Sequence, residues 1–159
     1  MKKISDNKKG LTRLGLLIII VLLIVVIIAL LVYFGNQKKR NFITMAKGYI
    51  NEVRTLVSED AITLPDTYKE RVVISISQIE PNKKLQKSSF GGEWVINKSY
   101  IIIKNSGTEY SPIYDYYIAL EDSKGNCLEL TEESKLERNL VSKGCIIEEY
   151  AETSDAYIE

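Results

Sequence analysis

Few side chains in this 159-residue sequence are suited to chemistry, and histidine is absent. Without histidine, the sequence offers no histidine-based catalytic triad and no H-E-x-x-H zinc motif. Asp122 and Asn126 carry oxygens that could bind calcium, but their spacing is not that of an EF-hand loop, and a hairpin turn explains both. The sequence also contains no phosphate-binding loop and no dinucleotide fingerprint. We therefore expect no enzyme activity, no metal site and no cofactor.

Two cysteines, Cys127 and Cys145, are the remaining candidates for covalent chemistry. In an oxidising compartment they could form a disulfide. Closing a loop of that length would stabilise the fold by about 3 kcal/mol in the chain-entropy model. Two buried thiols are the alternative.

A basic leader precedes a long apolar run. The stretch "KKGLTRLG", residues 8–15, leads into residues 14–34, which contain no charge and consist almost entirely of Leu, Ile and Val. As a helix, 21 residues would extend roughly 31 Å, which is one bilayer crossing. The run is too long for a cleavable signal core and ends in "YFGNQKKR", a stop-transfer flank. We therefore interpret it as a membrane anchor.

Charge is segregated along the chain. Residues 1–40 contain eight basic residues and one acidic residue, a net charge of 8 − 1 = +7, whereas residues 41–159 contain 13 basic and 20 acidic residues, a net charge of 13 − 20 = −7. An acidic domain argues against nucleic acid as a partner. Five basic residues precede the apolar run and three follow it, which favours a cytoplasmic N-terminus and places residues 41–159 outside the cell.

The segment after the anchor has helical periodicity. Its apolar residues recur at intervals of three and one, which defines one helix face, while Lys47, Asn51 and Arg54 occupy the opposite face. Because Gly35 does not force a break, we expect one helix of more than 40 residues, ending between residues 58 and 60 before Pro65. The apolar stripe comprises Phe42, Met45, Ala46, Tyr49, Ile50, Val53, Leu56 and Val57.

The remainder of the chain has the pattern of strands. The stretches "RVVISIS", "SYIIIK" and "YDYYIALED" are rich in β-branched and aromatic residues, and "EDSKGNCLEL" is typical of a hairpin. "LTEESKLERNLV" is expected to form a short helix or a loop over the sheet edge. We predict an α+β fold, in which an antiparallel sheet of three to five strands covers the apolar stripe of the helix.

The basic leader, apolar span, amphipathic continuation and small sheet domain together resemble type IV pilins and the related pseudopilins. The signature region is "KKG" followed by "LTRLGLLIIIVLLIVVIIALL". The stretches "FITMAKGYINEVR", "SSFGGEW", "SYIIIK" and "YDYYIALEDSKGN" also look like pilin-like proteins of Gram-positive, Firmicute-type bacteria. The resemblance covers essentially the whole chain, although its signature is only partly kept.

The resemblance implies processing by a prepilin peptidase, which would cut between Gly10 and Leu11 and methylate the new amine of Leu11. The family carries a glutamate where this chain has Gly15, and an aliphatic residue where it has Arg13. In the family, that glutamate is thought to pair with the N-terminal amine of a neighbouring subunit, because an unpaired buried charge is costly. A missing glutamate is associated with tip pseudopilins, so we expect either a major subunit, a minor or tip subunit, or a divergent pilin-like membrane protein.

Four segments follow from this interpretation. Residues 1–10 form a cytoplasmic leader, residues 11–34 a transmembrane helix, residues 35–60 its amphipathic continuation and residues 61–159 an extracellular sheet domain. The implied partners are the membrane, other pilin-like subunits, a prepilin peptidase and, indirectly, an assembly platform and a motor ATPase. The protein would then belong to a type IV pilus, a pseudopilus or a competence-type filament. The alternative is a single-pass membrane protein whose ectodomain binds a ligand or a protein.

Overall fold

The structure is a computed structural model that describes residues 13–79, 85–108 and 110–150. Its helix α1, Arg13–Ser58, is 46 residues long, which confirms the expected single helix of more than 40 residues. The chain divides into two compact units, Met1–Asn36 and Gln37–Glu159, and α1 contributes to both. We call the second unit the sheet domain.

Five strands form one antiparallel sheet within the described part of the sheet domain, in the order β1-β2-β3-β4-β5. This arrangement confirms the predicted α+β class. The strands are β1 Arg71–Ser75, β2 Tyr100–Asn105, β3 Tyr114–Glu121, β4 Asn126–Glu132 and β5 Ser142–Lys143. Short helical segments connect them: α2 Ile76–Ile79, η1 Ile96–Lys98, η2 Glu133–Lys135 and η3 Arg138–Leu140.

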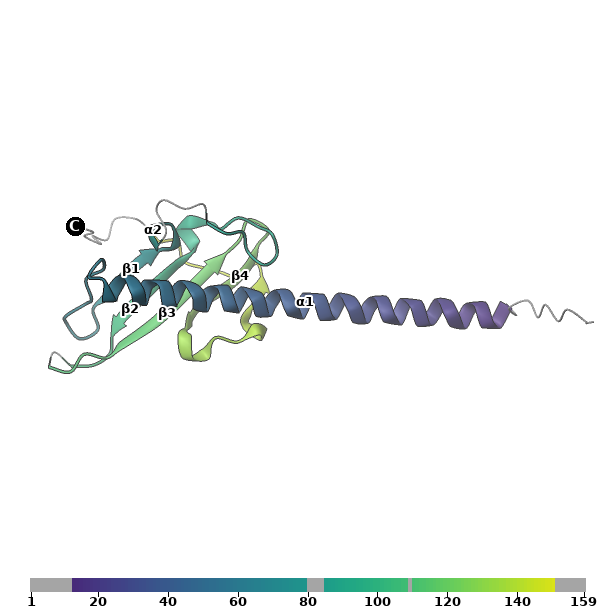
Figure 1. Ribbon diagram of the computed structural model, residues 1–159, viewed down its shortest axis with the longest axis horizontal. Helices are drawn as coiled ribbons and strands as arrows, with labels where there is room; N and C mark the ends of the chain where they lie inside the picture. Colours follow the sequence, from purple (N-terminus) through teal and green to yellow (C-terminus); the bar gives the residue numbers. More distant parts are fainter. Residues whose placement is uncertain (1–12, 80–84, 109, 151–159) are drawn as a thin grey trace, which may run out of the picture. The chain divides into compact units, whose positions relative to one another are not determined.

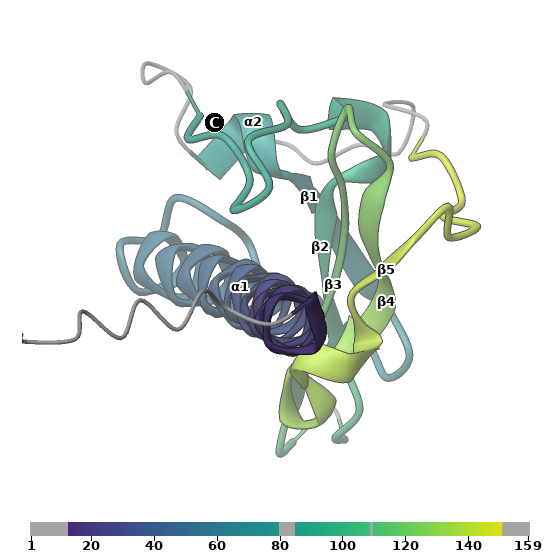
Figure 2. The same ribbon diagram turned by 90° about the vertical axis from the view of Figure 1, so that its right-hand side faces the viewer.

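One face of the sheet packs on the second half of α1, as Figures 1 and 2 show. Phe42, Ala46, Ile50 and Val53 of the predicted stripe are fully buried there, and Tyr49 is nearly so. The sheet supplies alternate residues, because successive side chains of a strand point to opposite faces. From β2 and β3 these are Ile101, Ile103, Tyr114, Tyr116, Ile118 and Leu120.

The opposite face of the sheet is also covered. Tyr100 and Ile102 of β2 form a second apolar cluster with Ala119, Cys127 and Ile147. The C-terminal segment that includes Ile147 crosses this face, drawn in yellow in Figure 2. A strand buried on both faces reads as a continuous apolar run, which explains "SYIIIK".

The predicted strand "RVVISIS" is partly wrong. Strand β1 ends at Ser75, and α2 begins at Ile76. The Ser75 backbone N–H donates to Oε1 of Gln78 at 2.9 Å, while the Ser77 N–H donates to Oγ of Ser75 at 3.4 Å. These contacts form a variant of the capping box, S-x-x-Q, in which the Ser75 hydroxyl accepts from the second helical N–H in place of the third, and they begin a helix.

The stretch "LTEESKLERNLV" forms neither one helix nor a plain loop. Glu132 ends β4, and the 3₁₀ turns η2 and η3 follow it. Glu133 accepts hydrogen bonds from both guanidinium NH groups of Arg54 on α1, with a length of 2.9 Å from Nη1 to Oε1. Arg54 also lies over the Tyr116 ring, 4.7 Å from its centre. This stretch is therefore joined to α1 by a charged hydrogen-bonded contact.

A buried carboxylate joins two loops at one end of the sheet. Asp122, 1% exposed, accepts hydrogen bonds from the Ser88 hydroxyl, from the Asn126 amide group and from the backbone N–H groups of Lys124 and Asn126. Gly92 lies against this carboxylate, since a Cβ placed there would be 2.7 Å from Cγ of Asp122. The loop before β2 and the β3–β4 turn are thereby fixed to each other.

Gly92→Ala is therefore expected to lower the free energy of unfolding by about 1–3 kcal/mol, because the added methyl group must displace a fully bonded carboxylate. Gly48→Ala is the matched control. Gly48 lies in α1 with open space around its Cβ position, so alanine there should raise stability by up to about 1 kcal/mol. Denaturant titration of both variants would test this, and equal effects would refute the packing at Gly92.

Candidate functional site

The first half of α1 is an exposed, uninterrupted apolar surface. Between Leu16 and Phe34 every large side chain is apolar, with exposed fractions of 44–67%. Transfer of each such side chain from water to an apolar environment is favourable by about 1.5–3 kcal/mol. The helix is long and apolar enough to cross a membrane.

Aromatic and basic residues follow one another where this apolar surface ends. The Tyr33 and Phe34 rings contact each other edge to face, with centroids 5.8 Å apart. Lys38, Lys39 and Arg40 come next in the same helix. Aromatic rings followed by cations are typical of the boundary between hydrocarbon and headgroups.

The structure describes only some of the residues that the pilin resemblance singled out. Gly10 and Leu11, the expected cleavage and methylation site, lie outside the described residues. Arg13 is the first residue of α1, and Gly15 lies two positions further along the helix. The two departures from the pilin signature thus belong to the beginning of the helix.

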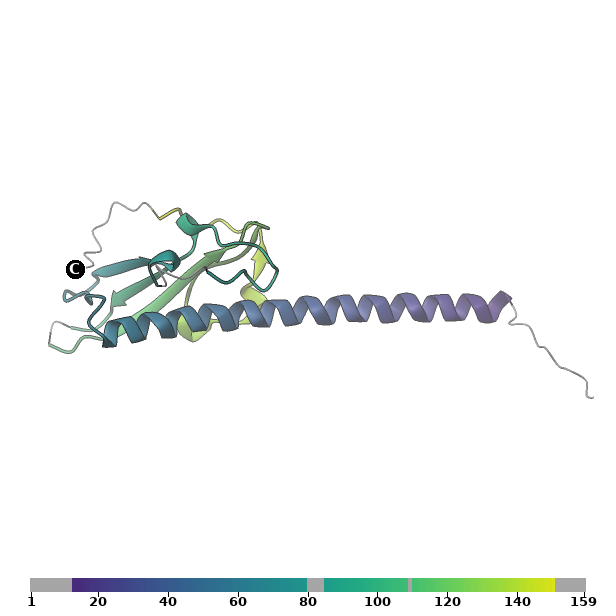
Figure 3. The same ribbon diagram turned by 45° about the horizontal axis from the view of Figure 1, so that its top comes forward.

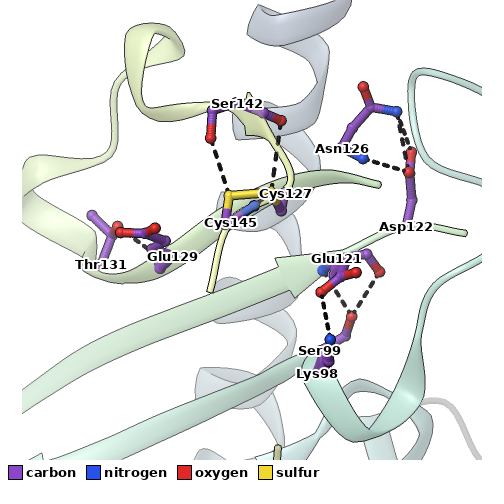
Figure 4. The surroundings of a disulfide bond; sticks show 10 residues. All are labelled: Lys98, Ser99, Glu121, Asp122, Asn126, Cys127, Glu129, Thr131, Ser142 and Cys145. Atoms are coloured by element: carbon purple, nitrogen blue, oxygen red, sulfur yellow. Dashed lines mark hydrogen bonds and ion pairs between the residues drawn. A yellow bond between two sulfur atoms is a disulfide. The ribbon is translucent and has the colours of Figure 1, made fainter. Parts of the chain in front are cut away.

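Cys127 and Cys145 form a disulfide, which confirms that prediction. Their Cα atoms are 6.0 Å apart, and Cys127 is fully buried. Figure 4 shows the bond between β4 and the segment that follows β5. Ile147, two residues further on, is buried on the face of the sheet opposite α1, which we call the outer face. The disulfide therefore fastens the C-terminal segment to the outer face.

Asp122 and Asn126, considered as calcium ligands from the sequence, contact each other directly (Figure 4). Both carboxylate oxygens of Asp122 already accept hydrogen bonds from protein donors. Within residues 13–79, 85–108 and 110–150, no group of three or more His, Cys, Asp or Glu side chains could hold a metal ion.

Two environments shift side-chain pKa values in the sheet domain. Burial raises the pKa of Tyr100 on the outer face; Glu148 adds to this effect and Arg71 opposes it. On the surface, hydrogen bonds from Lys135 and Ser134 lower the pKa of Glu132, and the same contact with Glu132 raises the pKa of Lys135. Each shift moves the pKa further from neutral pH, so the charge states of these three groups at neutral pH are the ordinary ones.

Exposed apolar side chains gather at the end of the sheet domain where α1 ends. Tyr110 and Ile113 lie in the β2–β3 connection with exposed fractions of 94% and 59%, and Tyr68 lies in the α1–β1 connection at 56%. The Lys69 N–H donates to the Asn105 carbonyl at 3.0 Å, which holds the two connections together. Figure 3 shows both at the same end of the sheet. Sequence periodicity does not reveal this group, because the residues lie in irregular connections.

Comparisons with protein-family models, with curated protein sequences and with solved structures find no match to this chain.

Proposed function

We propose that this chain is a pilin-like, membrane-anchored subunit of a type IV pilus, pseudopilus or competence-type filament. The observation that carries the proposal is that the two halves of α1 differ in what surrounds them. Residues 16–34 present exposed apolar side chains to the surroundings, whereas the second half of α1 buries one face against an antiparallel sheet. In a subunit of this kind, the first half of α1 can lie in lipid while the second half forms part of a folded domain.

The sequence around Gly10 and Leu11 supports processing by a prepilin peptidase. The domain then lies outside the cell, an orientation supported by the five-to-three basic bias and by the Cys127–Cys145 disulfide. Assembly would exchange the lipid contacts of the apolar half for contacts with neighbouring pilin-like helices. That exchange gains little apolar free energy, because lipid tails and aliphatic side chains are similar surroundings. An assembly platform and a motor ATPase would supply the work.

Arg13 and Gly15 favour a minor or tip subunit within this proposal. A subunit with a glycine at the glutamate position has no carboxylate to neutralise a neighbour's amine inside the apolar filament core. Burying a charged amine without a partner in the filament core costs free energy. The subunit therefore fits best at a position, such as the tip, where no neighbour's N-terminal amine needs a carboxylate partner from it.

Gly10→Val tests the processing step. The bulkier residue should block cleavage, so cells that contain the cognate peptidase should accumulate a longer form of the protein on a denaturing gel. Gly35→Val is the control, because nothing lies within 4 Å of the Cβ position at Gly35. Unchanged mobility of the Gly10 variant relative to wild type would count against peptidase recognition.

The second candidate function is a single-pass membrane protein whose ectodomain binds a ligand or another protein. The exposed Tyr110, Ile113 and Tyr68 favour it, because aromatic and aliphatic side chains at a loop end are common contact residues. The N-terminus distinguishes the two functions, since this candidate requires no cleavage after Gly10.

A further inference from the structure

Basic residues from several elements lie at the end of the sheet domain where α1 enters it. The Ser89 hydroxyl donates to the Lys38 carbonyl at 2.7 Å, which brings the loop before β2 to the beginning of the domain. Lys124 of the β3–β4 turn donates through Nζ to the Phe90 carbonyl of that loop at 2.9 Å. Figures 1 and 3 show the β3–β4 turn at this end of the sheet.

Lys143 joins the same group from β5. It pairs with Asn126 across the β4–β5 ladder, and the next residue, Gly144, donates to the Gly125 carbonyl of the β3–β4 turn at 2.9 Å. We call Lys38, Lys39, Arg40, Lys124 and Lys143 the basic collar. All of them are exposed except Lys39, which is half-buried.

Two acidic residues, Asp122 and Glu93, belong to the β3–β4 turn that carries Lys124 and to the loop before β2 that Lys124 contacts. Asp122 is buried, and its carboxylate oxygens accept hydrogen bonds from neutral protein donors. Glu93 is exposed and faces Lys87, a further lysine of the loop before β2, at 3.9 Å. The five positive charges of the collar therefore outnumber these two carboxylates, although residues 41–159, which contain Lys124 and Lys143, carry a net charge of −7.

We propose that the basic collar binds the anionic headgroups of the bilayer that α1 spans, on the leaflet facing the sheet domain. Lys38 lies four residues after Phe34, a rise of only about 6 Å along a helix, so the collar begins where the hydrocarbon ends. Cations near an anionic surface are attracted over roughly a Debye length. A nucleic acid fits less well, because the exposed apolar side chains of residues 16–34, which precede the collar in α1, suit a bilayer and offer a nucleic acid no contact.

Lipid binding would fix how the sheet domain lies on the membrane. The Asp122 hydrogen bonds hold the loop before β2 and the β3–β4 turn in place before any lipid is present. The backbone at Lys124 is therefore positioned in advance, and the β4–β5 pairing does the same for Lys143, so little backbone entropy is lost when they meet the headgroups. The inference rests on the membrane anchor of the proposed function and is independent of filament assembly.

Lysine acylation of the full chain in nanodiscs tests the proposal. A membrane-impermeant amine reagent, with peptide mass spectrometry as the readout, would be applied in discs of pure phosphatidylcholine and in discs with added phosphatidylglycerol. Lys124 and Lys143 should react about fivefold more slowly in the anionic discs, and 0.5 M salt should abolish the difference. Lys69 and Lys104 are the controls, because they lie towards the opposite end of the sheet, near Asn105.

Amide hydrogen exchange provides the second measurement. Anionic discs should slow exchange in the β3–β4 turn of wild type, and Lys124→Gln with Lys143→Gln should remove that effect, whereas Lys69→Gln with Lys104→Gln should not. Equal lysine reactivity in both lipids, or protection that persists in high salt, would overturn headgroup binding. A chain that fails to co-purify with either disc would overturn the membrane anchor itself, which separates the two failures.

Discussion

Phe42→Ala is expected to lower the free energy of unfolding by about 3–5 kcal/mol, the usual cost of removing a fully buried aromatic ring. Phe42 is 0% exposed and lies on α1 where the helix meets the sheet domain. Its ring centroid is 5.2 Å from that of Trp94 and 6.0 Å from that of Phe90. The substitution removes the contact that holds the loop before β2 against the helix.

Trp94 is the only tryptophan of the chain, so its fluorescence during denaturant titration of the full chain in detergent reports this loss directly. Phe34→Ala is the matched control on the same helix. Phe34 is 56% exposed, and its ring lies in the apolar half that faces the surroundings. Similar unfolding midpoints for Phe34→Ala and Phe42→Ala would contradict the division of α1 into an anchoring half and a packing half.

Removing the disulfide is expected to lower the free energy of unfolding by about 2–4 kcal/mol. Cys127 and Cys145 are 18 residues apart, and in the chain-entropy model opening a loop of that size costs about 3 kcal/mol. The C-terminal segment is otherwise held by the two-residue strand β5, by burial of Ile147 and by the Tyr150 N–H, which donates to the Asn97 carbonyl at 2.7 Å.

Cys127→Ala with Cys145→Ala should therefore speed amide hydrogen exchange in residues 144–150 far more than in β2 and β3. Wild-type protein in reductant should behave in the same way, which separates loss of the disulfide from effects of the new side chains. An unfolding midpoint that reductant leaves unchanged, with exchange of residues 144–150 equally slow, would show that the disulfide does not fasten this segment.

The helix and the fold class could be predicted because both depend on local patterns. The stripe from Phe42 to Val57 repeats with the period of an α-helix, and burial follows it closely, with Ile43 as an addition. The hairpin between β3 and β4 was predictable because Gly125 supplies the positive φ, +75°, that its turn needs.

Long-range contacts could not be predicted in the same way. Nothing in the spacing of Ile147 and Tyr150 indicates that they cover the outer face of the sheet, because that contact depends on where the disulfide leads the chain. The bonds from Ser88 to Asp122 and from Arg54 to Glu133 join residues 34 and 79 positions apart. By contrast, the S-x-x-Q capping box after β1 was a local signal that the strand prediction overlooked.

In the candidate site, too, the features that depend on local sequence could be predicted and those that depend on long-range contacts could not. The apolar half of α1 and the two cysteines were visible in the sequence, and the structure gives the first as an exposed helix and the second as a disulfide. The basic collar was not visible, because only contacts between folded loops link the segments that carry Lys38, Lys124 and Lys143. Gly10 and Leu11 remain a sequence prediction.

The intact mass of the native protein, purified from cells that contain its own peptidase, tests the proposed function most directly. The pilin-like assignment predicts a mass for residues 11–159 plus one methyl group, with the disulfide formed. An N-terminal peptide beginning at methylated Leu11 would identify the site. Retention of Met1 or of the leader up to Gly10 in the mature protein would contradict the pilin-like assignment.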